Sequence, residues 1–235
     1  MRADGGAERL CDAALELFGE HGYDATGVRA IAERAGVTAG LVVHHYGSKE
    51  GLRQAVDRFV LASIADAFAE LQVIGPGSDH LEIRKRGFRV LFQQRPYMGR
   101  YIRRSLLEGT EASVALFDRI LAVSRSLLEP LQQAGLVRPS GDPEAQVLLA
   151  MLSGLLPVLL PRHIERHLGL SLRSDAGVER WTRAEYELLT GGILRPPPGD
   201  APAHTMTVAD GDAAGVAGID GVAPAGRPGR RAGAR

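Results

Sequence analysis

Apolar residues recur three and four positions apart along most of the first 195 residues, which is the spacing of one face of an α-helix. The pattern predicts a first helix over residues 7–21, with a buried face made of Leu10, Ala13, Ala14, Leu17 and Phe18. No stretch of useful length in residues 79–195 alternates apolar and polar positions as a half-buried strand does. The hydrophobic pattern therefore predicts an all-α fold.

Two short helices joined by a tight turn are predicted within residues 26–46. The first carries its apolar face on Val28, Ile31, Ala32 and Ala35. Gly36 can adopt the left-handed backbone that ends a helix, and Thr38 can cap the next helix through its hydroxyl. The second helix is short and begins with small side chains, so it suits insertion into the major groove of DNA.

A fourth helix is predicted to begin at Ser48, a good N-cap residue. Its apolar stripe is expected to contain Leu52, Ala55, Val56, Phe59, Ser63, Ala67 and Leu71. A Gly-Pro-Gly-Ser sequence at residues 75–78 ends it. Five further helices are predicted over residues 79–94, 96–108, 111–134, 143–168 and 176–191, and Pro157 and Pro161 should kink or divide the fourth of these.

From residue 196 onward Gly, Ala, Pro and Asp dominate and large apolar residues nearly vanish. Such a segment cannot offset its own ordering entropy, so we predict a disordered low-complexity tail over residues 196–235. The tail carries Arg227, Arg230, Arg231 and Arg235. It is therefore interpreted as a solvated segment, with an auxiliary DNA-binding arm as the alternative.

The charge balance excludes a global electrostatic argument for nucleic acid, because 28 Lys and Arg residues match 28 Asp and Glu residues. Between residues 25 and 49, however, the cations Arg29, Arg34 and Lys49 face one acid, Glu33. This pattern argues against indiscriminate DNA binding and favours a small local footprint. The acids of the first helix must then face away from the phosphates.

A single cysteine, Cys11, excludes a disulfide framework and a cysteine-based zinc site. It is interpreted as a buried or half-buried thiol, with a redox switch as the alternative. Charges interrupt the first dozen residues, so no signal peptide is expected. The longest apolar run, residues 147–160, is broken by Ser153, Gly154 and Pro157 and is too short to span a bilayer. We therefore expect a soluble cytoplasmic protein without membrane contact.

Two histidine pairs are the candidate metal ligands. His44 and His45 are adjacent, so on a helix their side chains diverge by about 100° and rarely reach one ion. His163 and His167 lie four apart, a spacing that zinc sites use, but no third ligand is identifiable. We expect no metal and no cofactor, and a metal-sensing site at the second pair is the alternative to histidines that complement a helix dipole.

Three pieces of the chain, residues 31–37, 41–46 and 48–52, together resemble the DNA-binding domain of the TetR family of bacterial transcriptional regulators. The resemblance covers about residues 7–60. It implies that DNA is contacted by Arg29, Thr38, Ala39, Leu41, Val43, His44 and His45, and that Lys49 contacts a phosphate. Helix geometry separately predicts that Gly40 faces outward toward the groove. Val43 and His45 stand where the family often has an aromatic residue, and Gly51 stands where an acid would complete a capping box with Ser48.

An effector pocket is a weaker prediction from helical spacing. Its expected walls are Phe88, Phe92, Tyr101, Phe117 and Leu121, with Arg104 recognising an anion. The alternatives are that the apolar stripe is simply core and that the arginines of residues 97–108 are solvated or paired with acids.

The resemblance implies an N-terminal three-helix helix-turn-helix DNA-binding domain (residues 1–50, with the helix-turn-helix at about 27–46). A larger C-terminal helical ligand-binding and dimerisation domain would occupy residues 51–195. The expected function is that of a ligand-responsive repressor, in which a homodimer built through the last two long helices binds a palindromic double-stranded DNA operator and an unknown small-molecule effector. The alternative is a TetR-like protein that binds a protein partner or small molecule without DNA. A helical enzyme is disfavoured, since no Ser-His-Asp order, paired-carboxylate site or Gly-rich phosphate loop is found.

Overall fold

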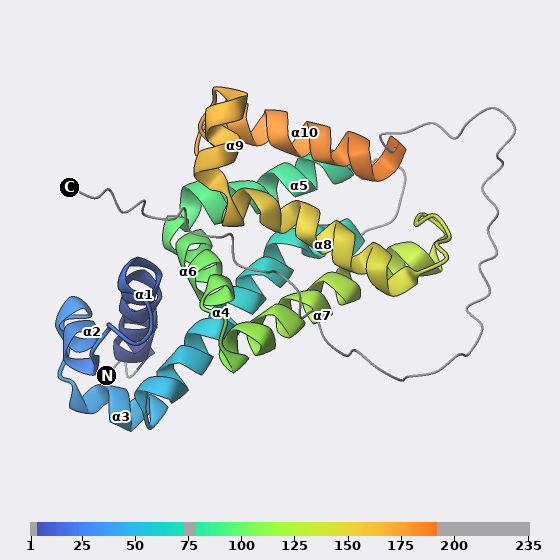
Figure 1. Ribbon diagram of the computed structural model, residues 1–235. Coiled ribbons are helices and arrows are strands. Elements are labelled where there is room, and N and C mark those ends of the chain that lie inside the picture. Colours follow the sequence, from blue (N-terminus) through green and yellow to red (C-terminus); the bar gives the residue numbers. More distant parts are fainter. Residues whose placement is uncertain (1–3, 73–78, 192–235) are drawn as a thin grey trace, which may run out of the picture. The chain divides into compact units, whose positions relative to one another are not determined.

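All regular structure in the computed structural model is helical over the residues it describes, 4–72 and 79–191 (Figure 1). The helices are α1 (Asp4–His21), α2 (Val28–Arg34), α3 (Gly40–Tyr46), α4 (Lys49–Phe68) with the short 3-10 turn η1 (Ala69–Gln72), α5 (His80–Arg89), the π-helical segment η2 (Val90–Gln94), α6 (Pro96–Leu107), α7 (Glu111–Gln133), α8 (Pro143–Leu159), α9 (Pro161–Leu168) and α10 (Asp175–Gly191). The predicted all-α class is confirmed.

The first three helices pack around a small apolar centre. Leu10 and Ala14 of α1, Ile31 of α2 and Val42 of α3 are fully buried there. The connection from α1 to α2 is held by Thr26, whose hydroxyl donates to the carbonyl oxygen of Gly22 at 2.7 Å. This unit is therefore fixed by apolar burial and by a local hydrogen bond in its loop.

Helix α4 leads from α3 into the larger set of helices and packs against α1, α3, α5 and α7 (Figure 1). Its buried stripe consists of Leu52, Val56, Asp57, Val60 and Ile64. Of the predicted stripe, Leu52 and Val56 are buried, and Phe59 is half-buried and packs against the core. Ala55, Ser63 and Ala67 are only half-buried, whereas Val60 and Ile64, which were not predicted, are buried.

A buried polar cluster ties α4 to α6 and α7. The Asp57 carboxylate accepts a hydrogen bond from the Tyr101 hydroxyl at 2.5 Å and one from the Arg119 guanidinium at 2.8 Å. Asp57 and Tyr101 are 3% and 2% exposed, so both of these groups are sheltered from water. Because a buried carboxylate must be paired, this cluster fixes how α4 meets the two helices behind it.

Two prolines act differently in the predicted helix over residues 143–168. Pro157 lies inside α8 without ending it, whereas Pro161 begins α9. The axes of α8 and α9 differ by 83° across that break. The division was predicted, but only Pro161 accounts for it, since proline is well suited to the first turn of a helix.

None of the described helices is by itself long and apolar enough to cross a membrane, although α8 and α9 taken together, across their 83° bend, pass that test by length and composition. The predicted tail at residues 196–235 lies outside the described residues.

Candidate nucleic-acid interface

The turn between α2 and α3 is built around Gly36. This glycine has a φ of 65°, in the left-handed region that its missing Cβ makes accessible. The Gly36 N–H donates to the Glu33 oxygen at 3.0 Å, and the Val37 N–H donates to the Ala32 oxygen at 2.9 Å. These two bonds form a Schellman motif, which satisfies the last carbonyls of α2 and turns the chain sharply into α3.

The inner face of α3 is anchored at both ends. Val42 is fully buried against the apolar centre, and the Tyr46 hydroxyl donates to the carbonyl oxygen of Ala7 on α1 at 2.7 Å. Burial raises the pKa of Tyr46, with a further contribution from Cys11, so the hydroxyl stays protonated as the donor. The short helix therefore cannot rotate without losing a packed valine and a hydrogen bond.

The outer face of α3 is open to solvent. Val43 is 62% exposed, an unusual position for a β-branched apolar side chain, and Thr38, Gly40, His44 and His45 are also exposed. Ala39 and Leu41 are half-buried at the start of the helix. The rings of His44 and His45 meet edge to face at 4.9 Å between centroids. A convex face of this size and composition can approach base edges in a groove.

Thr38 does not cap α3 as predicted. The helix begins at Gly40 with Ala39 as its N-cap, and no side chain accepts a hydrogen bond from its first turn. Instead the carbonyl oxygen of Thr38 accepts from the Leu41 N–H at 3.1 Å. The exposed hydroxyl of Thr38 is thus left without a partner among the described residues and can donate to a phosphate.

The junction between α3 and α4 depends on Gly51. Ser48 caps α4 by accepting a hydrogen bond from the Gly51 N–H at 3.0 Å. A Cβ on residue 51 would lie 2.0 Å from the carbonyl oxygen of Tyr46, so only glycine permits this approach. The absence of an acid from the capping box is therefore explained by a steric requirement.

The start of α4 presents two cations on one aromatic ring. The Lys49 ammonium lies 4.2 Å from the centre of the Tyr23 ring, and the Arg53 guanidinium carbon lies 4.8 Å from it. Such contacts orient a cation without cancelling its charge, so Lys49 remains able to bind a phosphate. Tyr23 and Arg53 were not predicted, because nothing local in the sequence shows that the α1–α2 connection meets α4.

The two arginines of α2 have different surroundings. Arg29 is exposed and has no partner among the described residues, whereas Arg34 forms an ion pair of 2.6 Å with Glu16 of α1. The hydrogen bond to Arg34 holds the pKa of Glu16 below its usual value. Glu20 is likewise paired with Arg100 at 3.0 Å. Arg29 and Lys49 are therefore the cations of the predicted footprint that form no ion pair with a described residue, and two acids of α1 are paired with protein cations.

The six residues predicted to wall an effector pocket do not surround one cavity. Phe92 lines a cavity beside α6, and Tyr101 lines only a gap of about 10 Å³ next to Asp57. Phe88 is buried against Phe68 and Phe92, and Phe117 and Leu121 are half-buried against the core. The Arg104 guanidinium donates to the Glu20 and His21 carbonyl oxygens at 3.3 and 3.0 Å. Arg104 thus caps α1, and no anion site is formed there.

Cys11 is half-buried, and burial raises the pKa of its thiol to about 11, with Asp12 contributing to the rise. Among the described residues no group of three or more His, Cys, Asp and Glu side chains could hold a metal ion. His163 and His167 are both exposed.

Two family profiles match this chain. The profile described as "Bacterial regulatory proteins, tetR family" matches residues 10–56, and the profile described as "Tetracyclin repressor-like, C-terminal domain" matches residues 93–195. Together they cover more than half of the sequence. The first match contains α2, the turn at Gly36, α3 and the Ser48 cap.

Among curated proteins, the HTH-type transcriptional regulatory protein RaaS of Mycobacterium tuberculosis is 37% identical over 147 residues. The match covers 62% of this chain and 66% of RaaS, so the chain spans slightly less than two thirds of that relative. Among solved structures, the regulator FadR from Bacillus subtilis, in complex with stearoyl-CoA, gives a TM-score of 0.63 at 17% identity, covering 80% of this chain and 99% of that one.

The fatty acid degradation regulator FadR from Bacillus halodurans gives a TM-score of 0.65 at 16% identity, covering 83% and 100% of the two chains. At these identities the structural likeness shows a shared fold.

Proposed function

Since the chain belongs to the TetR family of bacterial regulatory proteins, we propose that it is a sequence-specific DNA-binding transcriptional regulator that acts as a repressor. The observation that carries the proposal is the arrangement of α3. Val42 and Tyr46 fix the helix from behind, while Thr38, Val43 and His44 project into solvent. An exposed helix held at a fixed angle by the helices behind it is the geometry that reads a major groove.

The contact residues divide by chemistry. Lys49, oriented on Tyr23, and Arg29 are the phosphate contacts, which position the protein without reading sequence. Val43 offers only apolar contact, such as to the methyl group of thymine, and His44 can donate to or accept from a base edge. Thr38, Ala39, Gly40, Leu41 and His45 complete the proposed interface.

The regulator is proposed to act as a homodimer through α8 and α10. Leu149, Leu156 and Leu160 follow one face of α8 and its C-terminus and are exposed, as are Leu188 and Leu189 on α10. The two helices are joined by a hydrogen bond of 2.9 Å from Ser153 to Glu185. Because exposed leucines on neighbouring helices are typical of an interface, a second copy of the chain is their proposed cover.

A symmetric dimer reads a palindromic operator in the cytoplasm, with half-sites about one helical turn apart. A small-molecule effector bound among α5–α10 would favour a different spacing of the two α3 helices, so effector and operator would weaken each other's binding equally. The protein is proposed to work by this coupled binding and to catalyse no reaction.

Selection of random duplexes by the purified protein tests the proposal. We expect enrichment of a palindrome, and an affinity that falls steeply as salt rises because phosphate contacts release counterions. Lys49→Ala should weaken binding about equally for all duplexes, whereas Arg166→Gln on α9, far along the chain from the interface, should not. Recovery of no preferred sequence, or binding that is insensitive to salt, would favour the alternative of a protein that has kept the fold without the DNA.

A further inference from the structure

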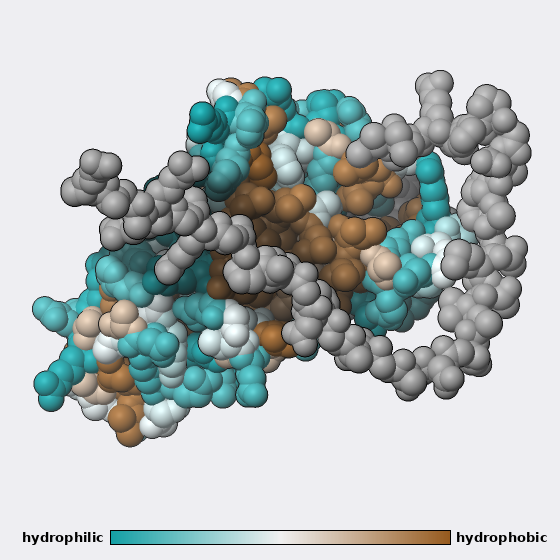
Figure 2. All heavy atoms as spheres, viewed as in Figure 1, coloured by the Kyte–Doolittle hydropathy of each residue, from teal (hydrophilic) through white to brown (hydrophobic). Residues whose placement is uncertain are grey.

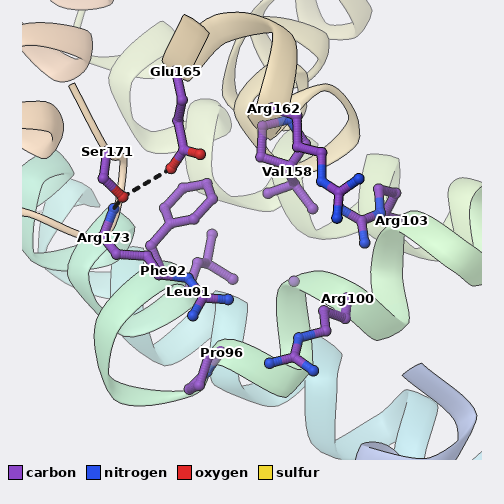
Figure 3. A pocket seen from close by; sticks show the side chains of 12 residues that line it. Leu91, Phe92, Pro96, Arg100, Arg103, Val158, Arg162, Glu165, Ser171 and Arg173 are labelled. Atoms are coloured by element: carbon purple, nitrogen blue, oxygen red, sulfur yellow. Dashed lines mark hydrogen bonds between the residues drawn. The ribbon is translucent and has the colours of Figure 1, made fainter. Parts of the chain in front are cut away.

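A cavity of about 400 Å³ lies between α6, α9 and the segment that joins α9 to α10 (Figure 3). Four arginines line it, namely Arg100, Arg103, Arg162 and Arg173. Its remaining walls include the apolar side chains of Leu91, Phe92 and Val158. Figure 3 shows the guanidinium groups of Arg103 and Arg162 close to one another in the view, beside Val158.

The positive charge of this cavity is largely unneutralised by the described residues. Arg103, Arg162 and Arg173 form no ion pair there, and only Arg100 has one, to Glu20. The single acid in the wall, Glu165, accepts hydrogen bonds from the Ser171 hydroxyl at 3.0 Å and from the Leu172 N–H at 2.8 Å. Guanidinium groups that face one space repel one another, so an anion bound among them would relieve that repulsion.

A second cavity, of about 250 Å³, adjoins the first. Its wall is mainly apolar and includes the leucines Leu127, Leu128 and Leu131 of α7 and Leu155 of α8. Figure 2 shows hydrophobic residues gathered in a hollow where α7 and α8 lie. Of its polar lining residues, Arg84 is paired with the buried Glu185 at 2.6 Å, whereas the buried Nε2 of His80 has no hydrogen-bond partner among the described residues.

The two cavities share Leu91 and Val158 in their walls, so the thickness of these side chains separates them. We propose that one ligand occupies both: an organic anion, with a carboxylate or phosphate head among the arginines and an unbranched apolar tail that passes Leu91 and Val158 into the leucine-lined cavity. The head supplies the missing counter-charge, and the tail removes apolar surface from water on both sides.

The same site has a direct connection to the DNA-binding helices. Arg100 reaches the cavity from α6 and also holds Glu20 of α1. Where α1 crosses α6, a Cβ on Gly19 would lie 3.1 Å from the Tyr101 nitrogen, so the two backbones are nearly in contact. An anion that draws Arg100 toward the cavity removes the partner of Glu20 and disturbs this crossing. That regulatory step rests on the proposed function, whereas the binding of the ligand does not.

Calorimetric titration of the full-length protein without DNA tests the binding. Sodium octanoate is expected to bind at least tenfold more tightly than octan-1-ol, which lacks the charge, and than inorganic phosphate, which lacks the tail. The double variant R103Q/R162Q should lose at least tenfold for octanoate and nothing for octan-1-ol. R166Q, one turn further along α9 and outside the cavity wall, should bind octanoate as the unaltered protein does. Equal affinity for octanoate and octan-1-ol, or unchanged octanoate binding by R103Q/R162Q, would overturn the anion site.

The path of the tail is tested by chain length. Each added methylene should tighten binding up to about fourfold, so octanoate should exceed butanoate at least tenfold and dodecanoate should exceed octanoate. L128W, which fills the leucine-lined cavity, should remove the gain from octanoate to dodecanoate while leaving butanoate unchanged. If L128W fails to fold, the chain-length series on the unaltered protein decides, and a flat series would contradict a buried tail.

Regulation is tested by adding octanoate to the complex of the protein with its selected duplex. Release of the duplex supports the coupling through Arg100, and an undisturbed complex at saturating octanoate refutes it. A protein that binds octanoate but selects no duplex would keep this site and lose the proposed function. A protein that selects a palindrome but does not bind octanoate would keep the proposed function and lose this site.

Discussion

Replacing Tyr101 with phenylalanine removes the hydroxyl that donates to Asp57 and leaves that carboxylate bonded to Arg119. A hydrogen bond to a charged group contributes roughly 1.5–3 kcal/mol, and two groups that are 2% and 3% exposed cannot recover it from bulk water. The adjoining gap of about 10 Å³ is at the lower limit for one water molecule, so a water that enters would bring the loss toward the lower value. At roughly 2–4 °C per kcal/mol for a chain of this size, Tyr101→Phe should lower the melting temperature by about 3–12 °C.

Thermal unfolding followed by circular dichroism measures this effect, with Tyr186→Phe as the matched control because no described residue accepts a hydrogen bond from the half-buried Tyr186 hydroxyl. Burial and the charge of Asp57 raise the pKa of Tyr101 well above its usual value. Above a pH of about 10 a tyrosine ionises in the unfolded chain but not in this site, so stability should fall as pH rises, and less so in Tyr101→Phe. A melting temperature within 1 °C of the unaltered protein would refute the account of the Asp57 cluster.

Three other changes have defined outcomes. Gly51→Ala should cost about 1–3 kcal/mol in urea unfolding, since its Cβ would meet the Tyr46 oxygen. Gly40→Ala, with open space around it, should be neutral or stabilising in the same unfolding measurement, and equal losses of stability would contradict the steric argument. His44→Ala should change the duplex sequence selected without changing the melting temperature, and an unchanged selection would remove His44 from the readout. Cys11, with a thiol pKa of about 11, should form about 100-fold less thiolate at pH 8 than a thiol with the usual pKa of 9.0. A disulfide reagent should therefore label Cys11 slowly in the folded protein and faster after unfolding, and fast labelling of the folded protein would contradict the raised pKa.

The local parts of the fold were predictable because short-range chemistry specifies them. Gly36 ends α2 through its own backbone freedom, and Pro161 starts α9 because its ring suits a first helical turn. The inner and outer faces of α3 follow from its period, since Val42 and Val43 are neighbours in sequence and point in opposite directions. The same signals predicted the bounds of α6, α7 and α10 to within one residue, whereas α1 begins three residues earlier than predicted.

The non-local parts were not predictable from one sequence. Asp57 reads as an ordinary solvated acid on α4 until Tyr101 and Arg119 are brought to it across three helices. From the sequence, Gly51 indicates only a weakened helix cap, and the structure is needed to show that the Tyr46 oxygen lies beside it. The π-helical segment at η2, which places Leu91 and Phe92 at a cavity wall, has no proline or glycine to announce it. Which arginines pair and which stay free also depends on packing.

We propose that two copies of α3, each held outward by Val42 and Tyr46, read one duplex together. Its most direct test is fluorescence anisotropy with the selected palindrome and with a derivative that carries five extra base pairs between the half-sites. Five base pairs turn the second half-site to the opposite side of the duplex, where a fixed twofold protein cannot reach it. We expect two protomers on the original duplex and at least a tenfold loss of affinity on the derivative. Equal affinity for the two duplexes, with one protomer bound to each, would contradict it.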